Sequence, residues 1–133
     1  MACPYFYPAA PRAGASGSAM LPLGDLWAGT CRAVPGAPWQ PGDAILRPLC
    51  NLGYARETCQ RFPPGDGPDA VRFTLLAAGP CLRLYYVVER DHHPFAHGPL
   101  EYSRASGSLV QPPEDEILAR QAAAYAESIL RRL

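Results

Sequence analysis

The chain has 133 residues and a mass of 14.4 kDa, the size of one compact domain covering residues 1–133. Hydrophobic residues make up 48% of the sequence and charged residues 18%, which supports a packed core and excludes wholesale disorder. Twelve basic and twelve acidic residues cancel, and neither half carries the basic surplus typical of nucleic-acid binders. We therefore expect no nucleic-acid partner.

The first half of the chain, residues 1–68, holds eleven of the sixteen prolines and nine of the twelve glycines. Proline removes a backbone donor and breaks helices, so this half is predicted to form only short helical pieces and turns. Leu23–Arg32 is the first predicted helical piece. The segment Ala9–Ala19, rich in alanine, glycine and serine, is predicted to be a flexible surface segment.

A second short helix is predicted over Pro41–Leu52. Pro41 suits the first position of a helix, and Gly53 suits the position just after its end. Pro48 lies inside this segment and is expected to kink or shorten the helix.

The second half of the chain, residues 69–133, has the patterns of regular structure. Residues 71–75 and 82–89 alternate between apolar and polar side chains, and Ala78-Gly79-Pro80 between them is a turn signal. The two segments are predicted to pair as an antiparallel hairpin. Leu100–Ser103 is predicted to add a third strand after a loop over Asp91–Pro99.

A helix is predicted from Pro113 to the C-terminus, with acidic residues in its first turn and Arg131 and Arg132 in its last, as the helix dipole favours. One face carries an apolar stripe predicted to cover the sheet, formed by Leu118, Ala122, Tyr125, Ile129 and Leu133. The expected fold class is α+β. An irregular, cysteine-containing half with short helices is expected to pack on a small antiparallel sheet and a C-terminal helix.

Cysteine is enriched in the irregular half, which contains Cys3, Cys31, Cys50 and Cys59. Small irregular regions are often held together by disulfides or by a metal, and four thiolates suit either a tetrahedral zinc ion or an iron–sulfur cluster. Structural zinc sites usually take their ligands in close pairs, and this chain has no Cys-x-x-Cys. A [4Fe–4S] cluster binds its four ligands on separate irons and accepts cysteines from distant turns.

We therefore predict a [4Fe–4S] cluster on these four cysteines, with zinc as the alternative. Unliganded thiols packed as small hydrophobic side chains are the third possibility. Cys81 follows the predicted hairpin turn and is expected to stay apart from the centre. Aromatic residues near the four cysteines are expected to shield a cluster or to form a docking face for a protein partner, and these are Tyr5, Tyr7, Trp27 and Trp39.

Three segments, Cys3–Phe6, Cys50–Pro63 and Tyr86–Gly98, resemble a group of short bacterial proteins with four cysteines. The resemblance extends from residue 3 to about residue 103. It implies that these residues form one unit, and it implies no reaction, because no activity is known for the group.

The segment from Glu89 to His97 holds the three histidines of the chain, His92, His93 and His97, together with two acids. Such a group could bind a divalent metal or perform acid–base chemistry, or it could be a polar loop after a strand. The chain has no His-Glu-x-x-His pattern, no glycine-rich phosphate loop and no Gly-x-Ser-x-Gly motif.

Three function classes follow from these patterns. The first is a small iron–sulfur protein that carries electrons or forms a cluster-stabilised subunit of a larger complex. The second is a zinc-stabilised or metal-free protein-interaction module, and the third is a small enzyme using residues 89–97. We expect a role other than catalysis. No apolar run of about 20 residues and no secretory signal occur in the sequence, so a cytoplasmic protein without a membrane span is expected.

Overall fold

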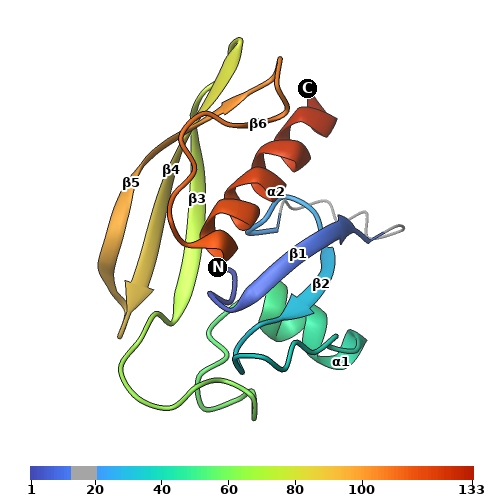
Figure 1. The fold of residues 1–133 in the computed structure, drawn as a ribbon, viewed down its shortest axis with the longest axis vertical. Coiled ribbons are helices and arrows are strands. Elements are labelled where there is room, and N and C mark those ends of the chain that lie inside the picture. Colours follow the sequence, from blue (N-terminus) through green and yellow to red (C-terminus); the bar gives the residue numbers. More distant parts are fainter. Residues whose placement is uncertain (13–20) are drawn as a thin grey trace.

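The computed structural model describes residues 1–12 and 21–133 (Figure 1). The first residues of the predicted surface segment Ala9–Ala19 belong to a strand. From position 13 onward the segment lies outside the described residues. In chain order the elements are β1 (Phe6–Pro11), β2 (Trp27–Cys31), α1 (Asp43–Ile45), the π-helix η1 (Leu46–Asn51), β3 (Ala70–Ala77), β4 (Cys81–Arg90), β5 (His93–Ser103), β6 (Ser108–Leu109) and α2 (Glu116–Arg132).

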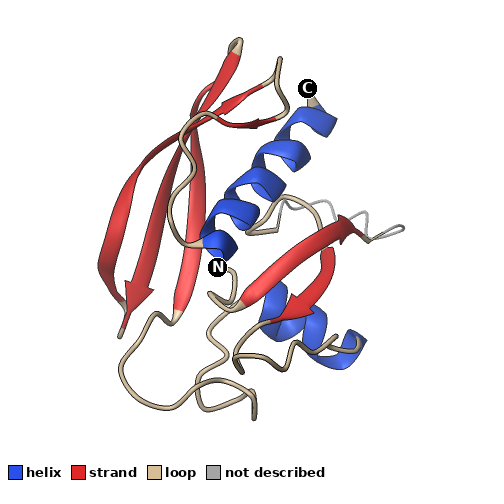
Figure 2. Cartoon of the chain, in the orientation of Figure 1, coloured by secondary structure: helices blue, strands red, loops and turns tan. Residues whose placement is uncertain are grey.

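Helix α2 lies between two antiparallel sheets (Figures 1 and 2). On one side is the four-stranded sheet β3-β4-β5-β6, and on the other is the two-stranded sheet β1-β2. Alternate residues of the larger sheet face the helix and are buried, among them Phe73, Leu82, Leu84, Leu100 and Tyr102. Residues of both halves of the chain share this core. The predicted α+β fold class is confirmed.

The predicted hairpin of residues 71–75 and 82–89 is confirmed, because β3 and β4 pair antiparallel with Phe73 opposite Tyr86. The loop predicted over Asp91–Pro99 is wrong. Only Asp91 and His92 form the turn, both with positive φ, which matches the twist of a two-residue hairpin. Strand β5 tolerates its prolines because β6 covers only its last two residues, and proline is compatible with an open strand edge.

The helix predicted over Leu23–Arg32 is also wrong, since this segment contains strand β2. Phe6 pairs with Cys31 and Pro11 with Trp27, so the first half contains a small sheet in addition to short helices and turns. Two glycines explain the difference. Gly24 has a φ of +88°, and Gly29 packs against β1 so closely that a Cβ would lie 2.1 Å from the carbonyl oxygen of Tyr7.

The short helix predicted over Pro41–Leu52 is confirmed as α1 and η1. Pro48 lies within the π-helical part, where the wider i→i+5 spacing replaces the α-helical register that proline would disrupt. Gly53 ends the segment with a φ of +82°, and a side chain there would collide with the backbone of Met1.

Helix α2 begins at Glu116, three residues later than Pro113. Asp115 caps it, because its carboxylate accepts hydrogen bonds from Ile117 N at 2.9 Å and Leu118 N at 3.1 Å. The predicted apolar stripe is buried at Leu118, Ala122, Tyr125 and Ile129. Leu133 lies beyond the helix and is 68% exposed, so its predicted place in the core is wrong.

Replacing Asp115 by alanine is expected to lower the free energy of unfolding by about 1 kcal/mol, because two backbone donors lose their acceptor. Urea titration followed by circular dichroism measures this difference. Glu114→Ala is the matched control, since Glu114 is an exposed acid one residue outside the cap. Equal stability of both variants would contradict the role of the cap.

Candidate metal centre

The β1-β2 sheet brings Cys3 and Cys31 to the same end of the molecule. Cys31 ends β2 and pairs with Phe6, which is only three residues from Cys3. The backbone of Cys31 also bonds to Trp39 in both directions, at 2.6 and 3.0 Å. Both cysteines are buried.

Two further cysteines reach this place from the segment that follows β2. Cys50 lies in η1, and its carbonyl oxygen accepts a hydrogen bond from Cys3 N at 3.0 Å. Cys59 lies in the next turn, where its N–H donates to Ala55 O at 2.7 Å, and its side chain packs half-buried against the core. Cys81 begins β4 after the β3–β4 turn, at the far end of the larger sheet from β1 and β2 (Figure 1).

The four thiols of the first half interact electrostatically. Burial raises the pKa of Cys50 to about 12, and the neighbouring Cys3, Cys31 and Cys59 act in the same direction. Burial also raises the pKa of Cys3 to about 12, against a smaller lowering effect of the backbone at Tyr5 and Phe6. At neutral pH these two thiols are therefore protonated unless a cation replaces their protons.

All five cysteines are free thiols. Within residues 1–12 and 21–133, no three histidine, cysteine, aspartate or glutamate side chains are arranged so that they could hold a metal ion as they stand. The four thiols form an electrostatic group, and their role as ligands is a matter of proposal.

The aromatic residues that were expected near the cysteines differ in how deeply they are buried. Tyr5 and Phe62 meet edge to face at 5.3 Å, and the Arg61 guanidinium lies 4.8 Å from the Trp39 ring centre. Trp27 is only 1% exposed, and its indole N–H donates to Leu23 O and Ser128 Oγ, both at 3.1 Å. The expectation that Trp27 contributes to a docking face is therefore wrong, because it belongs to the core.

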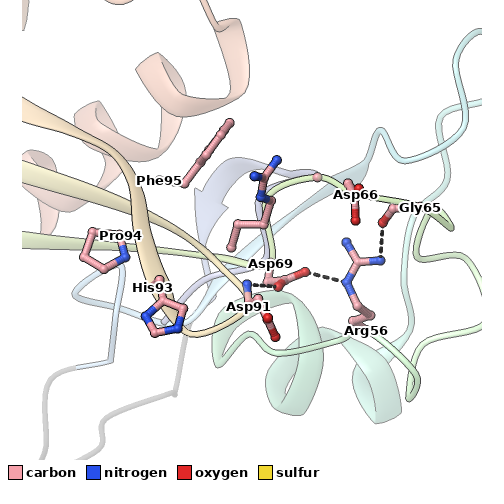
Figure 3. A pocket seen from close by; sticks show the side chains of 10 residues that line it. Arg56, Gly65, Asp66, Asp69, Asp91, His93, Pro94 and Phe95 are labelled. Carbon is pink, nitrogen blue, oxygen red and sulfur yellow. Dashed lines mark hydrogen bonds and ion pairs between the residues drawn. The ribbon is translucent and has the colours of Figure 1, made fainter.

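The three histidines do not converge. His92 stacks on Tyr54 with ring centres 5.1 Å apart, while His97 Nδ1 lies 2.5 Å from the hydroxyl of Tyr85. His93 lines a pocket of about 590 Å³, which also contains Arg56, Asp66, Asp69, Arg90, Asp91 and Phe95 (Figure 3). This pocket is where an enzyme using residues 89–97 would bind a substrate.

An ion pair forms one wall of this pocket. Arg56 Nε donates to Asp69 Oδ1 at 2.5 Å, and Arg56 Nη1 donates to Gly65 O at 2.8 Å (Figure 3). Burial raises the pKa of Asp69, but the N–H of Asp91 and the guanidinium of Arg56 outweigh burial and hold that pKa below its usual value.

Replacing Arg56 by methionine is expected to lower the free energy of unfolding at pH 7 by about 1 kcal/mol, a modest value because solvent screens a partly exposed pair. The folded pKa of Asp69 is depressed, so its contribution is present above about pH 4 and is lost as the pH falls further. Unfolding by urea at pH 7 and pH 3 tests this. The exposed Arg83→Met is the control, and a pH-independent difference for Arg56→Met would contradict the assignment.

Two buried amides near the centre were not predicted from the sequence. Asn51 accepts from Trp27 N at 2.9 Å and donates to Trp27 O and Leu46 O at 3.0 and 2.9 Å, which ties η1 to β2. Gln121 of α2 donates to Cys3 O and Phe6 O. The only local signal for Asn51 is its position directly after Cys50.

Comparison of the chain with protein-family models, curated proteins and solved structures gives no match. The similarity to short bacterial four-cysteine proteins therefore stays a prediction. In the described part of the chain, helices long and apolar enough to cross a membrane are not found.

Proposed function

We propose that the chain is a small iron–sulfur protein in which Cys3, Cys31, Cys50 and Cys59 hold a [4Fe–4S] cluster. The observation that carries the proposal is that backbone pairing brings Cys3 next to Cys50, with Cys3 N donating to Cys50 O at 3.0 Å, and places Cys31 opposite Phe6, three residues from Cys3. Four soft thiolate donors are the ligand set of such a cluster. When bound, the cluster would supply a one-electron redox couple.

The surroundings of the thiols support a ligand role over simple packing. A neutral thiol buried as a hydrophobic side chain needs no hydrogen-bond donors, whereas a metal-bound thiolate is stabilised by them. The backbone at Tyr5 and Phe6 favours the thiolate of Cys3, because it lowers the pKa of that thiol against the effect of burial. Tyr5, Leu49 and Phe62 pack against the core that includes Cys3 and Cys50, and they would help to exclude water from a cluster.

The separation of the ligands in the chain favours a cluster over zinc. Cysteines 3, 31, 50 and 59 form no close pair in sequence, and a cluster accepts ligands that are further apart than those of one tetrahedral ion. Zinc remains the alternative cofactor, in a protein-interaction module.

Anaerobic purification with assays for iron, sulfide and zinc tests the proposal. We expect a brown protein with broad visible absorbance and with iron and sulfide in equal amounts. A colourless protein with stoichiometric zinc would favour the zinc alternative, and a metal-free protein with five titratable thiols would favour packed cysteines. Either result would contradict the proposed function.

We further propose that this protein acts in the cytoplasm as an electron carrier or a subunit bound to a protein partner. A net charge of zero gives little long-range steering, so docking would rely on short-range contacts of half-exposed aromatic residues such as Tyr5, Tyr7 and Trp39. Native mass in an extract, compared with that of the purified protein, tests this. A monomer in both would contradict it.

A further inference from the structure

The pocket bounded by β5 and the segment that follows η1 shares no lining residue with the proposed metal centre. Its volume of about 590 Å³ lies in the range of small-molecule sites, roughly 300–1,000 Å³. In Figure 3, residues 93–95 lie on one side of the pocket and Arg56 and Asp66 on the other, with Asp69 between them. The two walls come from distant parts of the chain, so the fold itself builds this cavity.

The pocket contains charges of both signs that lack an opposite partner in the protein. Arg56 and Asp69 neutralise each other through the ion pair that forms one wall. Within residues 1–12 and 21–133, the side chains of Arg90, Asp66 and Asp91, which also line the pocket, take part in no ion pair. A ligand in the pocket would therefore meet one guanidinium and two carboxylates that are free to bind it.

These free charges distinguish between classes of ligand. A purely anionic ligand would pair with Arg90 and would be repelled by two carboxylates. A purely cationic ligand would pair with the carboxylates and would leave Arg90 without a partner. A molecule with both a carboxylate and an ammonium group forms charge-assisted hydrogen bonds to both kinds of side chain. The charges of the pocket therefore favour a zwitterion.

An aromatic ring supplies the apolar surface of the pocket. Phe95 is 54% exposed, although it belongs to β5 and the guanidinium carbon of Arg90 lies 4.6 Å from its ring centre. An exposed ring on a rigid strand offers a face or an edge for stacking with a second ring. A ligand with an aromatic side chain would cover Phe95 while its charged end reaches Arg90.

Strained backbone flanks the two arginines of the pocket. Among the described residues, the non-glycine positions with positive φ are Tyr54, Glu57, Asp91 and His92. Each lies within two residues of Arg56 or Arg90 in sequence. Two-residue hairpin turns usually carry asparagine or glycine at such positions, and strained conformations of other residues concentrate at ligand sites. This backbone geometry is expected of a pre-organised binding site.

We infer that this pocket binds a free α-amino acid with an aromatic side chain. The carboxylate of the ligand pairs with Arg90, its ammonium group pairs with Asp66 or Asp91, and its side chain packs on Phe95. The inference does not depend on the proposed cluster, because none of the described residues that line the pocket is a cysteine.

Isothermal titration calorimetry with L-phenylalanine tests the inference, beside two analogues that each keep one charge. Hydrocinnamate keeps the carboxylate and lacks the ammonium group, whereas phenethylamine keeps the ammonium group and lacks the carboxylate. Because each missing group removes a charge-assisted contact, we expect L-phenylalanine to bind at least about tenfold more tightly than either analogue. Absence of saturable binding of L-phenylalanine, or an affinity no higher than that of an analogue, would overturn the inference.

Two variants separate the charged contacts. Arg90→Met is expected to weaken binding of L-phenylalanine and hydrocinnamate and to spare phenethylamine. The double variant Asp66→Asn and Asp91→Asn is expected to weaken binding of L-phenylalanine and phenethylamine and to spare hydrocinnamate. The matched control combines Arg83→Met with Glu101→Gln, because these exposed residues lie opposite each other on β4 and β5 outside the pocket. The control should bind like the wild type, and wild-type affinity for L-phenylalanine in both pocket variants would contradict the assignment.

Discussion

Cys50→Ser is expected to remove the proposed cluster and to open residues 1–68 to proteases, while the β3-β4-β5 sheet and α2 persist at least in part. Metal binding stabilises the fold wherever the unfolded chain lacks a preformed site. The first half has only short elements and many prolines and glycines, so losing a metal centre is expected to expose it to cleavage more than the longer strands and helix of the second half. The same result is expected for Cys59→Ser.

Limited proteolysis with mass spectrometry, together with iron analysis, measures this effect. Cys81→Ser is the control, because Cys81 begins β4 opposite Ser103 in the other sheet. It should keep both the iron and the wild-type cleavage pattern. If Cys50→Ser and Cys59→Ser left the first half as resistant as before, the thiols would be packed side chains and not ligands.

Asn51→Ala is expected to lower the free energy of unfolding by about 2–4 kcal/mol, because three buried backbone groups lose their partners at once. These groups are the N–H and carbonyl of Trp27 and the carbonyl of Leu46. Asn51 also follows Cys50 directly, so its loss would free a ligand segment. We therefore expect a lower iron content as well.

Urea unfolding of the Asn51 variant, compared with the exposed Gln111→Ala, tests this value. Asn51→Asp separates the bonds, because aspartate keeps the acceptor for Trp27 N and offers the two carbonyls no donor when ionised and a single donor when protonated. We expect its stability to lie between those of wild type and Asn51→Ala at low pH, where the acid is protonated. A loss below about 0.5 kcal/mol in Asn51→Ala, as at ordinary surface sites, would contradict the role of this residue.

The second half was predictable because its signals are local. Alternation in residues 71–75 and 82–89 and the apolar stripe of α2 each describe one element and its buried face. The errors arose where long-range pairing decides the structure. Strands β1 and β2 contain proline and glycine and pair across an intervening segment, and the prolines of β5 are tolerated only because that strand has an open edge.

The candidate site likewise combines features that the local sequence signals with contacts that only long-range packing creates. The enrichment of cysteine in the first half is visible in the sequence, and it is the signal behind the prediction that the four cysteines there form one site. Asn51 and Gln121 have no such signal, because their partners lie 24 and as many as 118 residues away. Only the packing of α2 against β1 brings Gln121 to the Cys3 turn. The expected ligand role of the cysteines stays a prediction.

The position of α2 between the two sheets has a consequence for biosynthesis. A ribosome makes Cys3 first and Gln121 only 118 residues later, yet the two are joined by a hydrogen bond. Arg120, which donates to Pro8 O at 2.7 Å, is added at the same late stage. The hydrogen bonds that tie α2 to the Cys3 turn and to β1 can therefore form only after residue 121 has left the ribosome.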